Sequence, residues 1–248
     1  MYSVWRRFTA AWRLVWALLH VLRGLLIIAL WFPRLGDDAR HMHVQLWSRH
    51  MLRVLGVSLR VQGNTAVGGP LLLVANHISW LDITALHAAR FCRFVSKADV
   101  QAWPLIGTLA AGAGTVFIQR ESRRDAMRVV HHMAEQLQAG HVLAVFPEGT
   151  TSDGRALLPF HGNLLQAAIS VDAPVQTVAL HFVDAQGQMS LAPCYIGDDT
   201  LLASVWRTLI TPGITVVLQF GELETAQGRT RQAWAHDLRD TITHMRQL

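Results

Sequence analysis

Short apolar runs alternate with longer segments of helical spacing over most of the chain. Seven runs predict strands, and they cover Val57–Gln62, Leu71–Ala75, Phe91–Ser96, Thr115–Ile118, Val142–Phe146, Val175–Phe182 and Ile214–Phe220. Helical patterns lie between or after them, at Leu81–Ala89, Pro104–Ala111, Ser122–Gln138, Asn163–Ser170 and Thr230–Gln247. This alternation indicates an α/β domain. Because several strands are almost wholly apolar, we predict a mixed, largely parallel sheet flanked by helices.

The N-terminal part has a different pattern. Leu14–Phe32 reads LVWALLHVLRGLLIIALWF, and a helix of about 20 residues is long enough to cross a bilayer. Arg23 lies near its middle, where a charge costs about 2.5–3.5 kcal/mol. A second helix is expected over Asp38–Leu59. We predict that residues 1–56 form two membrane-anchoring helices half-sunk in one leaflet, before an α/β domain over 57–248. A single span and a buried soluble hairpin are the alternatives.

Composition favours a membrane surface as the partner. Charged residues make up 16% of the chain, against roughly 25% in soluble domains. The net charge is +5, and arginines crowd the N-terminus at positions 6, 7, 13, 23, 34 and 40. Tryptophans that suit a headgroup boundary stand at 5, 12, 16, 31 and 47. Without zinc-finger spacing or an RNA-binding aromatic motif, nucleic acid is not expected. Two cysteines, Cys92 and Cys194, indicate a reducing compartment.

The first candidate site is NHISWLD, residues 76–82, which follows the apolar run LLLVA. Sites in open α/β sheets gather at the carboxyl ends of strands. His77 in the turn and Asp82 in the first helical turn would allow the imidazole to contact the carboxylate. Such a contact fixes the tautomer and makes a general base. Alternatively, His77 is structural and Asp82 only favours the helix start.

Two further segments follow strands in the same way. FPEGTTSDG, residues 146–154, offers Glu148, Gly149 and several hydroxyl and amide donors as a substrate cradle, or else an ordinary acidic turn. GTVFIQR ends in Arg120, which suits a phosphate or carboxylate, or else is a solvated charge. Lys97 is the one lysine beside 21 arginines. It would supply a compact ammonium.

Together these segments resemble the 1-acylglycerol-3-phosphate (lysophosphatidate) acyltransferases of the glycerolipid acyltransferase family. The matching blocks occur in family order over about residues 70–182. They are His77 and Asp82 in the motif N-H-x-x-x-x-D, Lys97 with WPLIG, Gly114–Arg120, Phe146–Ser152 and Pro174–Leu180.

The resemblance implies a reaction and its residues. An acyl group passes from acyl carrier protein or coenzyme A to the sn-2 hydroxyl of a lysophospholipid, giving phosphatidic acid. His77 would deprotonate this hydroxyl and Asp82 would orient His77. Lys97 and Arg120 would hold the phosphate, with Glu148, Gly149, Thr150 and Thr151 shaping the acceptor site. No cofactor or metal is implied. The expected location is the bilayer, at the cytoplasmic face of the bacterial inner membrane.

Some positions depart from the family pattern. Thr151 stands where the third motif commonly has arginine, His161 where a basic residue often follows Pro-Phe, and Thr177 where the fourth motif usually has proline. Arg155 is close enough in sequence to replace a missing cation. FPEGTT also resembles the lyso-ornithine lipid acyltransferases, whose acceptor carries no phosphate. A lyso-ornithine acceptor, a hydrolase, and a non-enzymatic lipid- or acyl-carrier-binding protein with a decayed site therefore stay open.

A metal site is not expected. Two histidine pairs occur, at 41 and 43 and at 131 and 132. On a helix, residues one or two positions apart do not share a face.

Overall fold

One sheet organises the part of the chain that the computed structural model describes, residues 2–119 and 123–247. Its strands are β1 (Ser58–Gln62), β2 (Leu71–Ala75), β3 (Arg93–Lys97), β4 (Val116–Ile118), β5 (Val142–Val145), β6 (Val175–Val183) and β7 (Thr215–Glu224). The spatial order is β1-β7-β6-β2-β5-β3-β4. β6 and β7 pair antiparallel and the other neighbours pair parallel. The predicted fold class is confirmed.

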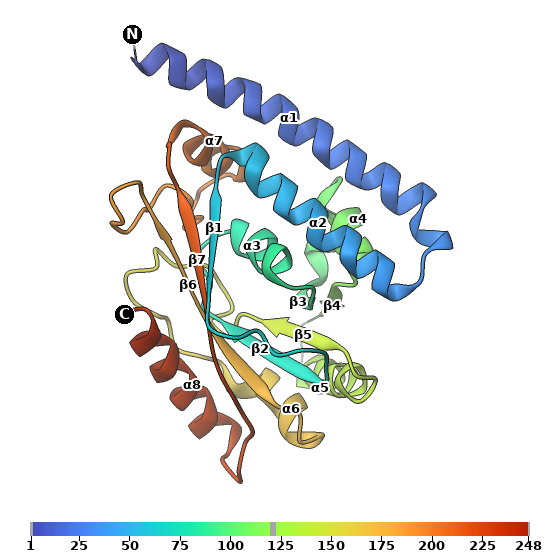
Figure 1. Cartoon of the computed structure of the whole chain (residues 1–248). Helices are drawn as coiled ribbons and strands as arrows, with labels where there is room; N and C mark the ends of the chain where they lie inside the picture. Colours follow the sequence, from blue (N-terminus) through green and yellow to red (C-terminus); the bar gives the residue numbers. More distant parts are fainter. Residues whose placement is uncertain (1, 120–122, 248) are drawn as a thin grey trace.

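Helices cover both faces of the sheet (Figure 1). α1 (Tyr2–Leu30), α2 (Asp37–Leu55), α3 (Leu81–Ala89) and α7 (Leu201–Ile210) lie over one face, and α4 (Ile106–Gly112) packs beside α1. α5 (Arg123–Gln138), α6 (Leu165–Ser170) and α8 (Arg231–Met245) lie over the other. Short 3-10 turns occupy Phe32–Arg34, Ala98–Ala102 and Gly162–Leu164.

Strand β2 shows why its residues are all apolar. Leu71, Leu73 and Ala75 belong to the buried cluster under α2 and α3. Leu72 and Val74 belong to the cluster under α5, α6 and α8. Because side chains alternate between the faces of a strand, both helical layers need apolar partners from the same five residues. The LLLVA pattern is therefore that of a strand between two apolar cores, one on each face of the sheet.

The N-terminal hairpin differs in detail from the prediction. α1 begins at Tyr2, about three turns before the expected start, because the first turns contain no helix breaker. α2 ends at Leu55, where Gly56 adopts φ +76° as the left-handed cap. Its side chains Met51, Leu52 and Leu55 are buried in the same cluster as β2. The division of the chain at residue 56 stays a prediction.

Trp47 holds the two N-terminal helices together. Its indole Nε1 donates to the carbonyl of His20 at 3.0 Å, and the two rings stack with centroids 4.9 Å apart. The tryptophans at 5, 12, 16 and 31 are exposed, as expected for a headgroup boundary, whereas Trp47 is partly buried between the helices. Its assignment to a lipid boundary was therefore wrong, because α2 turns this face toward α1.

Within the described residues, one helical stretch, Val4–Arg34, is long and apolar enough to cross a membrane. It has 31 residues, and 17% of its apolar window is buried in the protein. This low burial fits poorly with a core helix of a soluble protein. The length, composition and low burial of this helix together give weak evidence of membrane association.

Most predicted elements appear with shifted ends, but α7 was not predicted. Its start carries a recognisable signal, because the Thr200 side chain accepts a hydrogen bond from the Ala203 amide at 3.2 Å. Threonine before an apolar run is a favoured helix cap.

Replacing Gly24 by leucine should destabilise the hairpin, because a Cβ at Gly24 would lie 2.7 Å from Trp47 Nε1. Overpacking of this kind costs about 1–3 kcal/mol. We expect Gly24→Leu to lower Tm by several degrees in detergent, measured by circular dichroism. Ala29→Leu, at an exposed position of the same helix, should leave Tm unchanged. Equal Tm values for both variants would contradict the described packing.

Candidate active site

Strand register brings His77 and Glu148 together. Val74 of β2 pairs with Val145 of β5, and the strands are parallel. Both His77 and Glu148 stand three residues beyond this pair, at the same edge of the sheet. The His77 backbone amide donates to Glu148 Oε1 at 2.7 Å. Two segments far apart in sequence thus meet at the carboxyl ends of adjacent strands.

The expected contact between His77 and Asp82 is present. α3 begins at Leu81, so Asp82 lies in its first turn, and His77 Nδ1 is 2.8 Å from Asp82 Oδ2. The same oxygen accepts from the amides of Ile78 at 2.7 Å and Ser79 at 2.9 Å. As Oδ2 is the acceptor, Nδ1 carries the proton and Nε2 is left with its lone pair.

The pair is buried on one side and open on the other. The Asp82 side chain is 0% exposed and that of His77 is 18% exposed. Phe146 stacks on the imidazole with ring centroids 3.9 Å apart and planes 6° apart. Among the described residues, Nε2 has no hydrogen-bond partner. The arrangement can therefore accept a proton from a hydroxyl that approaches Nε2.

Asn76 explains the first position of NHISWLD. Its side-chain amide donates to the Leu180 carbonyl at 2.9 Å, and its oxygen accepts from the Leu180 amide at 2.7 Å. The side chain thus takes the place of a backbone partner where β2 has ended beside β6. This bidentate bond fixes the turn that carries His77.

Glu148 is held by backbone amides on both carboxylate oxygens. Besides the His77 amide, the Leu158 amide donates to Oε2 at 2.9 Å. Burial raises the pKa of the Glu148 carboxyl above its ordinary value, although the two amides act to lower it. Glu148 therefore ties together the two loops of the site.

The rest of this loop turns back toward His77. Gly149 has φ +72°, a conformation that favours glycine. The Ser152 amide donates to the His77 carbonyl at 3.0 Å. Thr150 is exposed, whereas the hydroxyl of Thr151 donates to the Tyr195 carbonyl. The predicted binding roles of these residues stay predictions.

Of the predicted cations, Lys97 is placed on a strand. Lys97 is the exposed last residue of β3 and pairs with Ile118 of β4, so it shares the carboxyl edge of the sheet with His77. Arg120 lies outside the described residues. Arg155 is exposed and lies 3.7 Å from its neighbour Asp153.

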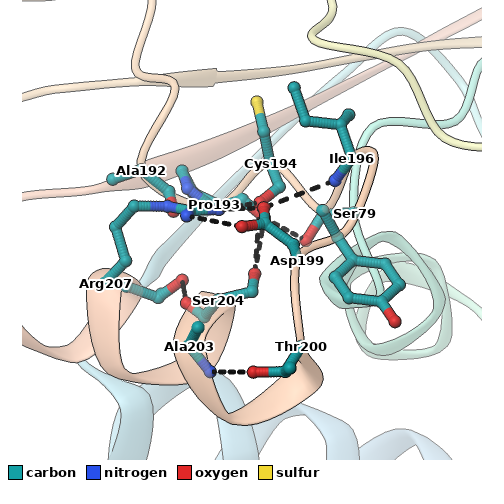
Figure 2. A network of polar contacts seen from close by, with 12 residues as sticks. Ser79, Ala192, Pro193, Cys194, Ile196, Asp199, Thr200, Ala203, Ser204 and Arg207 are labelled. Carbon is teal, nitrogen blue, oxygen red and sulfur yellow. Dashed lines mark hydrogen bonds and ion pairs between the residues drawn. The ribbon is translucent and has the colours of Figure 1, made fainter.

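Sequence reasoning missed a loop that backs the NHISWLD turn. Figure 2 shows Arg207 of α7 bonded to the Ala192 carbonyl at 2.9 Å and to Asp199 at 2.8 Å. The loop that Arg207 orders accepts a hydrogen bond from the Ser79 hydroxyl at the Pro193 carbonyl, 2.5 Å. The Tyr195 amide donates to the Ile78 carbonyl at 3.1 Å. The contacts of Ser79 and Ile78 with this loop link residues more than 100 positions apart, so a local sequence pattern cannot predict them.

Arg246 is a second residue that the sequence reasoning missed. It follows α8, and its Nε is buried with no hydrogen-bond partner among the described residues. Burial lowers the pKa of its guanidinium, while Glu148 and Asp153 act in the opposite direction. It therefore adds a cation to the electrostatic surroundings of Glu148.

Among the described residues, no group of three or more His, Cys, Asp or Glu side chains is arranged to hold a metal ion.

Comparison with known proteins identifies the family. An acyltransferase family model matches residues 57–181. A lyso-ornithine lipid O-acyltransferase from Pseudomonas aeruginosa is 40% identical over 84% of this chain and 80% of its own length. A 1-acyl-sn-glycerol-3-phosphate acyltransferase from Neisseria meningitidis is 34% identical over 89% and 91%.

The fold agrees with a solved structure of the same kind. The crystal structure of a 1-acyl-sn-glycerophosphate acyltransferase from Thermotoga maritima superposes with a TM-score of 0.69 at 18% identity, over 99% of this chain and 98% of the other. The chain belongs to the acyltransferase family and is a lysolipid acyltransferase.

Proposed function

We propose that this protein transfers a fatty acyl group from a thioester to the free hydroxyl of a lysolipid, with His77 as the general base. The observation that carries the proposal is the 2.8 Å contact between His77 Nδ1 and the buried Asp82 carboxylate. It leaves Nε2 as the proton acceptor on the more exposed side of the ring. The donor would be acyl carrier protein or coenzyme A.

The step follows from this geometry. His77 Nε2 takes the proton of the acceptor hydroxyl while the hydroxyl oxygen attacks the carbonyl carbon of the thioester. The C–S bond breaks, and the leaving thiolate takes the proton back from the imidazolium. Asp82 stabilises the imidazolium through Nδ1. No acyl-enzyme is needed. The exposed apolar face of α1 would keep the site where both lipid substrates lie.

Lyso-ornithine lipid is the acceptor that we place first. Thr151 supplies no charge and its hydroxyl is bonded to the Tyr195 carbonyl, while Arg155 lies beside Asp153. A phosphate would therefore find less positive charge on this loop than the common family motif offers. The 40% identity to a lyso-ornithine lipid acyltransferase supports the same choice.

Lysophosphatidate is the second candidate. The resemblance of the ordered sequence blocks to the lysophosphatidate acyltransferases favours it, and the Neisseria relative carries that activity in its name. Lys97 at the carboxyl edge of β3 and Arg120 would then hold the phosphate. Reaction at the sn-2 hydroxyl would give phosphatidic acid.

Replacing His77 by alanine should abolish acyl transfer, because it removes the proton acceptor. General-base catalysis contributes about 10²–10⁴-fold, so we expect kcat to fall at least about 100-fold, with Tm and membrane binding kept. Mass spectrometry of the lipid product gives the rate. His132→Ala, at an exposed position of α5, is the matched control. Near-normal turnover by His77→Ala would show that His77 is not the general base.

The same assay separates the other classes of protein. Release of free fatty acid from the thioester without any acceptor would indicate a hydrolase. Binding of lipid or acyl carrier with no thioester consumption would indicate a protein with a decayed site.

A panel of purified lysolipids should show preference for lyso-ornithine lipid over lysophosphatidate. Thr151→Arg should raise the relative kcat/KM for lysophosphatidate by about tenfold, because arginine binds phosphate with charge-assisted bonds. Thr151→Val, which loses the bond to Tyr195 without adding charge, should not change the ratio. A wild-type preference for lysophosphatidate would overturn the acceptor assignment and leave the base assignment intact.

A further inference from the structure

The C-terminal helix contacts the loop that carries Glu148. α8 packs beside β6, on the face of the sheet opposite the N-terminal hairpin (Figure 1). It lies outside residues 57–181, the part matched by the family model. From α8, Arg239 Nη2 donates to the Leu157 carbonyl at 2.8 Å and Nε donates to the Leu158 carbonyl at 3.1 Å. One guanidinium thus binds two consecutive carbonyls of the loop.

These bonds continue to the proposed base. The Leu158 amide donates to Glu148 Oε2 at 2.9 Å, and the other oxygen of Glu148 accepts from the His77 amide at 2.7 Å. Arg239, Leu158, Glu148 and His77 are therefore connected in series by described hydrogen bonds. The side chain of Leu157 is buried in the core beneath this loop.

Arginine suits this position for a geometric reason. Its planar fork presents donors in fixed directions, so it can hold adjacent carbonyls at once, whereas the donors of lysine are close together on one nitrogen at the end of a flexible stem. The Arg239 side chain is 33% exposed, and its nearest acidic group, Asp240, is 3.8 Å away. The two carbonyl bonds are thus the closer contacts of its guanidinium.

We infer that Arg239 is a positioning residue for acyl transfer: it fixes the Leu157–Leu158 peptide, whose amide holds Glu148, which in turn holds the backbone of His77. The inference rests on the proposed role of His77 as the base. Arg239 itself does not touch the reacting atoms. It acts by keeping Nε2 where the acceptor hydroxyl arrives, and small misplacements of catalytic groups cost about 10²-fold in rate.

The chain of bonds also predicts an effect on pH dependence. Glu148 is buried, and the titratable groups that face it are the imidazole of His77 and the guanidinium of Arg246. The Leu158 amide stabilises the ionised carboxylate. If the loop loosens and this bond is lost, the pKa of Glu148 rises further, and Glu148 takes up a proton at higher pH. The acid limb of the activity profile should then move to higher pH.

Arg239→Met tests the inference, because methionine keeps an apolar stem and removes every donor. We expect kcat to fall about tenfold or more, KM for the thioester to change little, and the acid limb to move to higher pH. Arg239→Lys should recover part of the lost kcat. If Arg239→Met does not fold, Arg239→Lys carries the test through its smaller loss of kcat and its pH profile.

Arg229→Met is the matched control, at a position just before the start of α8. Arg229 pairs with Glu224 at 2.7 Å and with Asp237 at 3.0 Å, and lies over the Trp234 ring. Its hydrogen bonds in the described part of the chain go to residues 224–226 and 237, not to residues 157–158. Its loss should lower Tm while kcat and the pH profile stay unchanged. Wild-type kcat and pH profile in Arg239→Met, or equal effects of both variants, would overturn the inference. Activity retained by His77→Ala would instead overturn the proposed function.

Discussion

The register between β2 and β5 is the constraint on which the site depends. Pairing of Val74 with Val145 puts His77 and Glu148 at one level, so the His77 amide reaches a carboxylate 71 positions away. A slip of one residue would turn every side chain of a strand to the other face. Both faces of β2 are buried by separate helical layers, and such a slip would also move Asn76 away from its two bonds to Leu180. Apolar burial thus sets the geometry of polar groups beyond the strand.

Past the strand ends, hydrogen bonds to the backbone take over from apolar packing. Asp82 accepts from two amides and the imidazole, Glu148 accepts from two amides, and Asn76 bonds both backbone groups of Leu180. Buried carboxylates are costly unless such donors surround them. Among the described residues, backbone amides bond one oxygen of Asp82 and both oxygens of Glu148, and no arginine or lysine forms an ion pair with either carboxylate.

The sequence was sufficient where a site residue is placed by its own element. Leu71–Ala75 and Leu81–Ala89 have the predicted ends, and the turn between them carries the predicted contact. The sequence pattern did not predict the contacts of residues whose partners are far away in the chain. The bond of Thr151 to Tyr195 gives a structural contact to a residue predicted for substrate binding, and Trp47 faces α1 rather than lipid. Neither outcome follows from spacing, because each depends on which face of a distant segment packs against the residue.

Both helical layers contribute contacts to the turn that carries His77. On the α1 side, α7 reaches NHISWLD through the Trp80 indole, which donates to the Ser204 hydroxyl at 3.1 Å, and α1 packs on α7. On the opposite side, Glu148 and the 157–158 peptide connect the turn to α8. His77 therefore lies where a layer joined to the apolar N-terminal helix meets a layer joined to the C-terminal helix. The proposed base is thus positioned relative to both the apolar N-terminal helix and the sheet, as the proposed reaction of a lipid substrate at an interface requires.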